Sequence, residues 1–511
     1  MGIVTRAASL WIEAACESND RAVVASCPTT FWEPDILMLW VHRGRNISLQ
    51  NDVVSELALR VGADVVVAPD VHNVQRHTRD FGVPGDERAN ILALTYPQST
   101  QQVAAILKFC NERRIAVQPQ GGMTGMAGGA VPVGPCVVIS LERMRAIKEL
   151  DVAAGTITVE AGVVMDTVQK AADAADLFFP LDLGGRGSCQ IGGNVSTNAG
   201  GNRVLRFGVA RDLVLGIEAV LADGTVIDSL RKVMKNNTGY DLRQLFIGAE
   251  GTLGIITGVV LRLFPKPRSV CTGICALDDY DGVLELLKRA RLGFGAQLTA
   301  FEVMWPDFYE LATVGLGRKA PLPTGAGVYV LLETMGQDPG VDQQRYETVI
   351  GEALEAGVVK DAIVAKSNRE TTELWTVRDS PGEWQRTLHW PQLGFDVSVP
   401  TGEIYTLMRE IDAELTSRWP ELKTVYFGHV ADGNLHASVR MNGHSVPALA
   451  IEDAVYSIVS RRKGSISAEH GIGSLKRKFL HYSRSPEELA LMRAIKQVMD
   501  PNGILNPGKV L

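Results

Sequence analysis

The sequence predicts a protein of mixed helices and strands, of the α/β or α+β class, with more than one domain. Three observations lead to this prediction. Segments with the apolar spacing of strands and of helices follow one another along the chain. A glycine-rich loop directly follows one of the predicted strands. The length of 511 residues exceeds what one compact core usually supports, so two or three domains are expected.

Strand and helix patterns alternate in the first half of the chain. Ser99 or Thr100 is positioned to cap one of the helices, and Asp223-Gly224 predicts a two-residue hairpin turn. The prolines of Pro265-Lys266-Pro267 predict a domain boundary. The predicted helices cover residues 51–61, 100–113 and 163–175. The predicted strands cover residues 91–94, 115–119, 137–141, 156–162, 216–222, 225–228 and 255–264.

The second half also mixes strands and helices, and we expect one open sheet with helices on one face. Predicted strands cover residues 328–333 and 395–400, and predicted helices cover 342–354, 404–415 and 486–499. Residues 1–50 differ in composition from the rest, and we expect them to be a poorly ordered extension.

Composition and charge exclude some classes of function. Hydrophobic residues make up 46% of the chain and charged residues 21%, an ordinary globular balance. The net charge is −7 and no long basic run occurs, which argues against nucleic acid as a partner. No apolar run reaches the roughly 18 residues that span a bilayer.

The cysteines and the N-terminus bear on location. The seven cysteines are odd in number and include no C-x-x-C, which favours free thiols in a reducing compartment. We therefore expect a cytoplasmic protein. A mitochondrial presequence is the less favoured reading, because Glu13, Glu17 and Asp20 interrupt the N-terminal segment.

Three glycine-rich loops lie in the first half, at residues 121–130, 184–201 and 248–254. None is followed by the Lys-Ser/Thr of a P-loop, and each by itself reads equally well as a structural turn. Together they leave space and bare backbone N–H groups for an extended anionic ligand. A dinucleotide in an elongated groove is the natural candidate.

Two short segments carry the residues best suited to chemistry. His429 and His436 flank an Asp-Gly-Asn turn, and Glu469-His470 follows some thirty residues later. A single histidine is more often a buried structural residue than a ligand. Two imidazoles and a carboxylate beside a third histidine instead predict a Zn²⁺ or Mn²⁺ site with a general base next to it.

These motifs resemble the FAD-linked oxidases of the vanillyl-alcohol oxidase and p-cresol methylhydroxylase superfamily, and within them the D-2-hydroxyacid dehydrogenases, especially those for D-2-hydroxyglutarate. The resemblance covers about residues 90–511. It is densest in residues 118–125, 180–201, 236–241 and 248–254, and in the two histidine segments.

The resemblance implies an α+β fold: a PCMH-type FAD-binding domain and a cap domain with an antiparallel sheet flanked by helices. The expected boundaries are 51–266 for the FAD-binding domain (core about 87–266), 267–460 for the cap, and 461–511 for a C-terminal segment that returns to the first domain. The residues expected to bind FAD are Gln120, Gly121, Gly122, Thr124, Gly125, Gly128, Gly129, Gly192, Gly193, Asn194, Thr197, Asn198, Gly200, Gly201, Glu250, Gly251, Gly254, Ile255 and Asn506. No histidine occurs between Thr78 and Leu388, so we expect the FAD to be non-covalent.

The resemblance also implies the reaction. A D-2-hydroxy acid would be oxidised to the 2-oxo acid, with His429, His436 and Glu469 holding the metal ion and His470 acting as the base. Arg378, Ser438 and His470 would contact the substrate. Electron-transfer flavoprotein or a quinone would accept the electrons, and a homodimer is possible.

The chain departs from the hydroxyglutarate pattern near the expected substrate site. Gly382 and Gly394 stand where a threonine and a lysine are expected, and Ser438 stands where an asparagine is expected. D-Lactate, D-malate or glycolate is therefore an alternative to D-2-hydroxyglutarate. A non-catalytic flavin-binding protein and a metal-dependent hydrolase are readings from other classes. The intact metal and base set argues against the first, and the glycine loops against the second.

Overall fold

The computed structural model describes residues 50–85, 90–388, 392–440 and 447–511. Residues 56–511 form one compact unit. The predicted extension lies outside the described residues apart from its last residue. Residues 50–61 are helical, in agreement with the apolar spacing of that segment.

A first layer of four strands is built around a parallel core. The strand order is β1-β2-β4-β3, in which β2–β4 and β3–β4 are parallel and β1–β2 is antiparallel. Helix α5 (Thr100–Arg113) connects β2 to β3, and the side chain of Ser99 caps it, one of the two caps that the sequence predicts. The strands are β1 (Val66–Val67), β2 (Ile91–Thr95), β3 (Ala116–Gln120) and β4 (Cys136–Ser140).

A second layer is an antiparallel sheet of order β5-β6-β10-β8-β9. The hairpin predicted at Asp223-Gly224 joins β8 to β9, and Gly224 has a φ of +86°. The strands are β5 (Ile147–Asp151), β6 (Thr156–Glu160), β8 (Val214–Val220), β9 (Val226–Ser229) and β10 (Ile255–Arg262). A separate pair is β7 (Leu177–Phe178) with β11 (Phe264–Pro265).

The helices between β1 and β11 are short apart from α5 and α6. Helix α6 (Met165–Ala174) buries Met165, Val168 and Ala172 against the five-stranded sheet. Helix α7 (Ile191–Ser196) lies within the second glycine-rich loop. The others are α4 (Val71–Val74), α8 (Val204–Phe207), α9 (Ala210–Leu213) and α10 (Arg243–Phe246).

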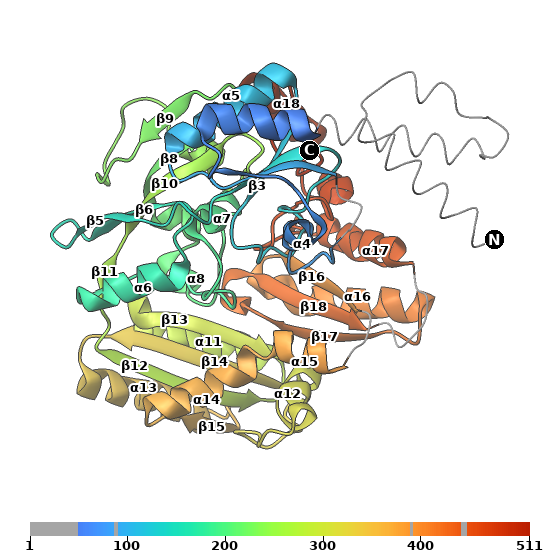
Figure 1. Ribbon diagram of the computed structural model, residues 1–511. Coiled ribbons are helices and arrows are strands. Elements are labelled where there is room, and N and C mark those ends of the chain that lie inside the picture. The colour runs from blue at the N-terminus through green and yellow to red at the C-terminus, as the bar shows by residue number, and fades with distance from the viewer. Residues whose placement is uncertain (1–49, 86–89, 389–391, 441–446) are drawn as a thin grey trace, which may run out of the picture. The chain divides into compact units, whose positions relative to one another are not determined.

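Residues 269–440 form a seven-stranded antiparallel sheet of order β15-β12-β14-β13-β17-β18-β16 (Figure 1). The strands are β12 (Ser269–Leu277), β13 (Leu298–Met304), β14 (Val328–Gly336), β15 (Asp361–Val364), β16 (Gln392–Ser398), β17 (Lys423–Gly428) and β18 (Asn434–Arg440). The hairpin β17–β18 carries the first histidine segment.

Helices cover both faces of this sheet, so the expectation of helices on one face is wrong. Alternate residues of β14 enter two different cores: Val330 packs with one helix group and Leu331 with the other. The near-continuous apolar run of β14 is typical of a strand buried on both sides. One group is α11 (Tyr280–Phe294), α13 (Pro339–Glu355), α16 (Ile404–Arg418) and α17 (Ala448–Arg461). The other group is α12 (Pro306–Ala312), α14 (Asn368–Arg378) and α15 (Pro381–Leu388).

The C-terminal segment packs against the first sheet. Helix α18 (Pro486–Met499) starts at Pro486, as predicted, behind a capping box formed by Ser485 and Glu488. Beyond it, Leu505 pairs with Val117 of β3 in a parallel bridge. Residues near the end of the chain therefore lie beside the first glycine-rich loop.

Two further findings concern the described residues alone. Cys110, Cys136, Cys189, Cys271 and Cys275 are free and buried. Within the described ranges, no helix combines the length and the apolar character that a bilayer crossing requires.

Candidate active site

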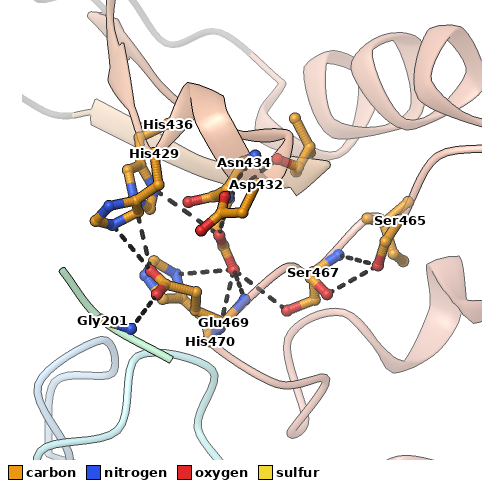
Figure 2. Close-up of polar contacts among 12 residues, drawn as sticks. Gly201, His429, Asp432, Asn434, His436, Ser465, Ser467, Glu469 and His470 are labelled. Carbon is orange, nitrogen blue, oxygen red and sulfur yellow. Dashed lines mark hydrogen bonds and ion pairs between the residues drawn. The ribbon is translucent and has the colours of Figure 1, made fainter. Parts of the chain in front are cut away.

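The two histidine segments meet in one cluster. His429 follows β17, His436 lies on β18, and Glu469 belongs to the segment after α17. Figure 2 shows the two imidazoles directed toward the Glu469 carboxylate. Both Nε2 atoms lie 3.7 Å from Glu469 Oε2.

A tight turn makes this meeting possible. Gly433 has a φ of +87°, and a Cβ there would lie 2.5 Å from the carbonyl oxygen of Val399. A side chain at this position would be strained and would clash with backbone, so the Asp-Gly-Asn turn requires its glycine. The turn sends the chain straight back from His429 to His436.

His429 is oriented by a buried carboxylate that the sequence analysis did not single out. Its Nδ1 lies 2.7 Å from Oε1 of Glu302 on β13, which leaves Nε2 directed at Glu469. A carboxylate on one ring nitrogen with a ligand position on the other is the usual arrangement of a metal-binding histidine. Burial would lower the pKa of His429, but Glu302 and Glu469 outweigh burial and raise it to about 9.

Arg378, at the end of α14, is buried beside this pair. Its Nε donates to Glu302 Oε2 at 2.7 Å, and its Nη2 lies 3.3 Å from His429 Nε2. Burial opposes ionisation of Glu302, yet His429 and Arg378 hold its pKa below the usual value. The guanidinium therefore lies next to the cluster formed by His429, His436 and Glu469.

His470 follows Glu469 and stacks on His436, with ring centroids 5.9 Å apart. Its backbone N–H donates to the buried carboxylate of Asp396 at 2.8 Å. Its ring remains partly exposed, in contrast to those of His429 and His436. A partly exposed imidazole beside the cluster of His429, His436 and Glu469 is suited to proton transfer with a bound substrate.

Ser438 lies farther along β18, and its hydroxyl donates to Gln392 Oε1 at 2.7 Å. Gly394 pairs with Ser438 across β16 and β18. A Cβ added at Gly382 or Gly394 would meet no atom of the described residues within 4 Å. The space that larger side chains could occupy at these two glycines is therefore open.

The second glycine-rich loop contacts the cluster of His429, His436 and Glu469 directly. The backbone N–H of Gly201 donates to Glu469 Oε1 at 2.6 Å, a contact drawn in Figure 2. Gly201 has a φ of +120°, and a Cβ there would lie 2.1 Å from Asp182 O. The second loop thus holds the carboxylate whose other oxygen faces the histidines.

A cavity of about 630 Å³ lies beside the first loop. Gly121 and Gly122 line it together with Gln190 and His77, neither of which the sequence analysis had named as a site residue. His77 contacts Gln120 at 2.5 Å through Nδ1 and the Tyr96 hydroxyl at 2.9 Å through Nε2. His77 lies just before the histidine-free span and outside the glycine-rich loops and the histidine motifs, so no sequence signal marks it.

Several buried oxygens near the loops have no hydrogen-bond partner among the described residues, including Oε1 of Gln190, Oδ1 of Asn194 and Oδ1 of Asn506. Asn506 also adopts a φ of +43° while its Nδ2 donates to Gly129 O and Glu250 O. Unpaired buried acceptors are costly unless a bound molecule satisfies them. These residues therefore fit a large polar cofactor in the groove.

Other residues expected to contact FAD have side chains that are already engaged. Gln120 Nε2 donates to His77 O and Ala130 O. The Glu250 carboxylate accepts from the backbone of Ile472 and Gly473 at 2.7 and 2.8 Å, and Asn198 Oδ1 accepts from Arg211 N. These side-chain contacts hold the loops in shape.

Comparison with known proteins identifies the family. The FAD binding domain family model matches residues 91–229, and the model for the C-terminal domain of FAD linked oxidases matches residues 266–510. The mitochondrial D-2-hydroxyglutarate dehydrogenase of Bos taurus is 41% identical over 83% of this chain and 77% of its own length. A putative mitochondrial D-lactate dehydrogenase of Schizosaccharomyces pombe is 38% identical over 81% of this chain and 80% of its own.

Among solved structures, p-cresol methylhydroxylase with substrate bound superposes with a TM-score of 0.71 at 18% identity, over 90% of this chain and 96% of that one. The predicted α+β fold, a PCMH-type FAD-binding domain with a cap domain, is confirmed.

The expected cytoplasmic location is wrong, because both the Bos taurus and the Schizosaccharomyces pombe relatives are named as mitochondrial proteins. Free cysteines indicate a reducing compartment without identifying which one.

The resemblance to FAD-linked oxidases is confirmed at a level of identity and coverage that leaves the family in no doubt. The chain belongs to the FAD-linked oxidases, the family that includes the Bos taurus D-2-hydroxyglutarate dehydrogenase, and is an FAD-dependent oxidoreductase.

Proposed function

We propose that the chain oxidises a D-2-hydroxy acid to the 2-oxo acid, with D-2-hydroxyglutarate as the leading substrate. One observation carries the proposal: His429, His436 and Glu469 converge next to His470, and the second glycine-rich loop binds the same Glu469. Groups for binding an α-hydroxy carboxylate and for taking its proton thus adjoin the groove of a redox cofactor. The name of the Bos taurus relative supports the choice of substrate.

We propose His429, His436 and Glu469 as the ligands of a divalent ion, Zn²⁺ or Mn²⁺. Ligand atoms of a tetrahedral zinc site lie ~3.4 Å apart, given the usual metal–ligand lengths. The 3.7 Å separations between Glu469 Oε2 and the two Nε2 atoms are close to that value. Three protein ligands leave coordination positions for a substrate.

When bound, FAD supplies the hydride acceptor and the divalent ion supplies a Lewis acid for the substrate hydroxyl. His470 takes the hydroxyl proton, since its ring is the open imidazole of the cluster. Arg378 binds a substrate carboxylate through the part of its planar fork that Glu302 does not use. Ser438 is proposed to line the far end of the substrate site.

The second carboxylate of D-2-hydroxyglutarate has fewer anchors here than the hydroxyglutarate pattern implies. Gly382 and Gly394 offer no side chain, and the Ser438 hydroxyl is engaged with Gln392. D-Lactate, D-malate or glycolate is therefore the second candidate, and the name of the Schizosaccharomyces pombe relative supports D-lactate.

The experiment is a comparison of kcat/KM for D-2-hydroxyglutarate, D-malate, D-lactate and glycolate with an artificial electron acceptor. We expect D-2-hydroxyglutarate to lead. A higher kcat/KM for D-lactate would reassign the substrate while leaving the reaction intact. A flavin that none of these acids reduces would overturn the proposed function.

The remaining expectations belong to the same proposal. FAD is bound non-covalently by residues of the three loops and Asn506, supported by the unpaired acceptors there. Residues 51–266 bind FAD, 267–460 form the cap and 461–511 return to the first domain, supported by the pairing of Leu505 with Val117. Electron-transfer flavoprotein or a quinone is the proposed acceptor, and a homodimer the proposed assembly.

A further inference from the structure

Asp396 is a fully buried acid at the centre of β16, with an exposed fraction of 0%. A buried carboxylate is costly unless charges and hydrogen bonds compensate it. His470 Nδ1 and Lys476 Nζ lie 3.8 and 3.9 Å from its Oδ2, and His436 Nδ1 lies 3.8 Å from its Oδ1. The side chain is therefore a buried carboxylate surrounded by residues of the candidate active site.

One oxygen of Asp396 binds the segment that carries Glu469 and His470. Its Oδ2 accepts hydrogen bonds from the backbone N–H groups of both residues, each at 2.8 Å. Lys476 Nζ lies 3.9 Å from the same oxygen. Two adjacent N–H groups directed at one carboxylate oxygen fix the orientation of that peptide, and with it the directions of the two side chains.

The other oxygen binds the histidine hairpin. Oδ1 accepts from Asn434 Nδ2 at 2.9 Å, and Asn434 begins β18 directly after the turn. Asp396 also pairs in register with His436 across β16 and β18, and Oδ1 lies 3.8 Å from His436 Nδ1. One carboxylate thus contacts both segments, which lie more than thirty residues apart in the chain.

We infer that Asp396 is a positioning residue that holds the His436 hairpin and the Glu469–His470 segment in the relative placement needed for metal binding and proton transfer. The inference rests on the proposed function. Asp396 acts through the residues that it orients. The geometry of the cluster of His429, His436 and Glu469 therefore depends on a carboxylate in β16 that the histidine motifs do not reveal.

The test is Asp396→Asn in the full-length FAD-bound protein. The asparagine amide has one oxygen, which accepts hydrogen bonds, and one NH₂ group, which donates them. If the oxygen accepts from the two backbone N–H groups, the NH₂ group faces Asn434 Nδ2, which is also a donor. In the opposite orientation the NH₂ group faces the two backbone N–H groups. Partners of this kind typically change metal affinity or activity 10–100-fold. We expect a 10–100-fold weaker affinity for Co²⁺, measured by its visible absorption after chelator treatment, and a similar drop in the rate of anaerobic flavin reduction.

Asp342→Asn is the matched control. Asp342 is a buried residue in the first turn of α13 whose oxygens accept from Asp338 N and Gln297 Nε2, away from the cluster. We expect it to lower thermal stability while Co²⁺ affinity and flavin reduction stay within twofold of the wild type. Asn434→Ala removes a single donor to Asp396 and serves if Asp396→Asn does not fold. It should weaken Co²⁺ binding severalfold with FAD content unchanged.

The inference is overturned if Asp396→Asn folds, retains FAD and matches the wild type in both measurements. It is also overturned if Asp342→Asn lowers Co²⁺ affinity equally, or if Asn434→Ala leaves Co²⁺ affinity unchanged when it stands in for Asp396→Asn. A wild-type flavin that no D-2-hydroxy acid reduces would instead refute the proposed function. The Co²⁺ titrations would still decide whether Asp396 positions the ligands.

Discussion

Replacing Glu302 with glutamine tests how the buried charges of the site depend on one another. Glu302 Oε1 and Oε2 contact His429 Nδ1 and Arg378 Nε, each at 2.7 Å, and its side chain is 1% exposed. A glutamine keeps the size but offers one acceptor and one donor group. Its NH₂ group must face either the Arg378 guanidinium or the N–H of the His429 ring.

The expected cost follows from these contacts. Charge-assisted hydrogen bonds contribute about 1.5–3 kcal/mol each, and removing one partner of a buried ion pair typically costs about 3–5 kcal/mol. We therefore expect Glu302→Gln to lower the free energy of unfolding in urea by about 3–5 kcal/mol. If the amide turns toward His429, the ring changes tautomer and Nε2 is no longer a ligand, so metal affinity should fall roughly 10–100-fold.

Glu333→Gln is the control, because Glu333 is equally buried on the neighbouring strand β14. Its Oε2 accepts from Trp375 Nε1 at 2.7 Å, and its Oε1 lies 3.6 Å from Arg203 Nε. A glutamine there keeps an acceptor for Trp375 and loses one ion pair beyond hydrogen-bond distance, so the loss of stability should be smaller. Equal losses of stability in the two variants, or unchanged metal affinity in Glu302→Gln, would refute the reasoning.

The pH dependence of the Glu302 effect has a definite sign. The folded-state pKa lies below the ordinary value of 4.5, so the unfolded state binds more protons as the pH falls through this range. The stabilisation is fully present above pH 4.5 and is lost as the pH falls through the folded-state pKa. The difference in unfolding free energy between wild type and Glu302→Gln should therefore shrink in acid.

Three further predictions concern the chemistry. His470→Ala should abolish flavin reduction in a single turnover while FAD stays bound, and normal reduction would contradict its role as the base. Arg378→Lys keeps the charge but loses the planar fork, so kcat/KM should fall about 10–100-fold, mainly through KM. An unchanged KM would exclude a substrate contact. Ser438→Asn restores the residue of the hydroxyglutarate pattern and should raise kcat/KM for D-2-hydroxyglutarate relative to D-lactate, as a substrate panel would show.

Local signals in the sequence predicted much of the fold. Helix α18 was predicted with its observed bounds because Ser485, Pro486 and Glu488 specify its start within four residues. The hairpin at Asp223-Gly224 is equally local. The sequence did not predict that helices also cover the second face of the large sheet. Whether one or both faces are buried depends on which helices pack against the sheet, and this packing is not a local property of the sequence.

The sequence likewise predicted one part of the candidate site and missed another. The proposed ligands His429, His436 and Glu469 stand in short motifs and could be named from the sequence. Glu302 and Asp396 could not, because each acts on partners at least 38 residues away in the chain. A charged residue inside an apolar strand, as in Phe301-Glu302-Val303, is the signal that could have revealed Glu302. Resemblance likewise suggested Gln120 and Glu250 as FAD contacts without showing that their side chains bind the protein itself.

The central claim is that a D-2-hydroxy acid is oxidised by FAD at the site formed by His429, His436, Glu469 and His470. The most direct test is anaerobic stopped-flow reduction of the bound flavin by D- and L-2-hydroxyglutarate, before and after chelator treatment. We predict rapid bleaching by the D-enantiomer alone, its loss after chelation with FAD retained, and recovery on adding Zn²⁺ or Mn²⁺. Equal bleaching by both enantiomers, or bleaching that chelation leaves unchanged, would contradict the account.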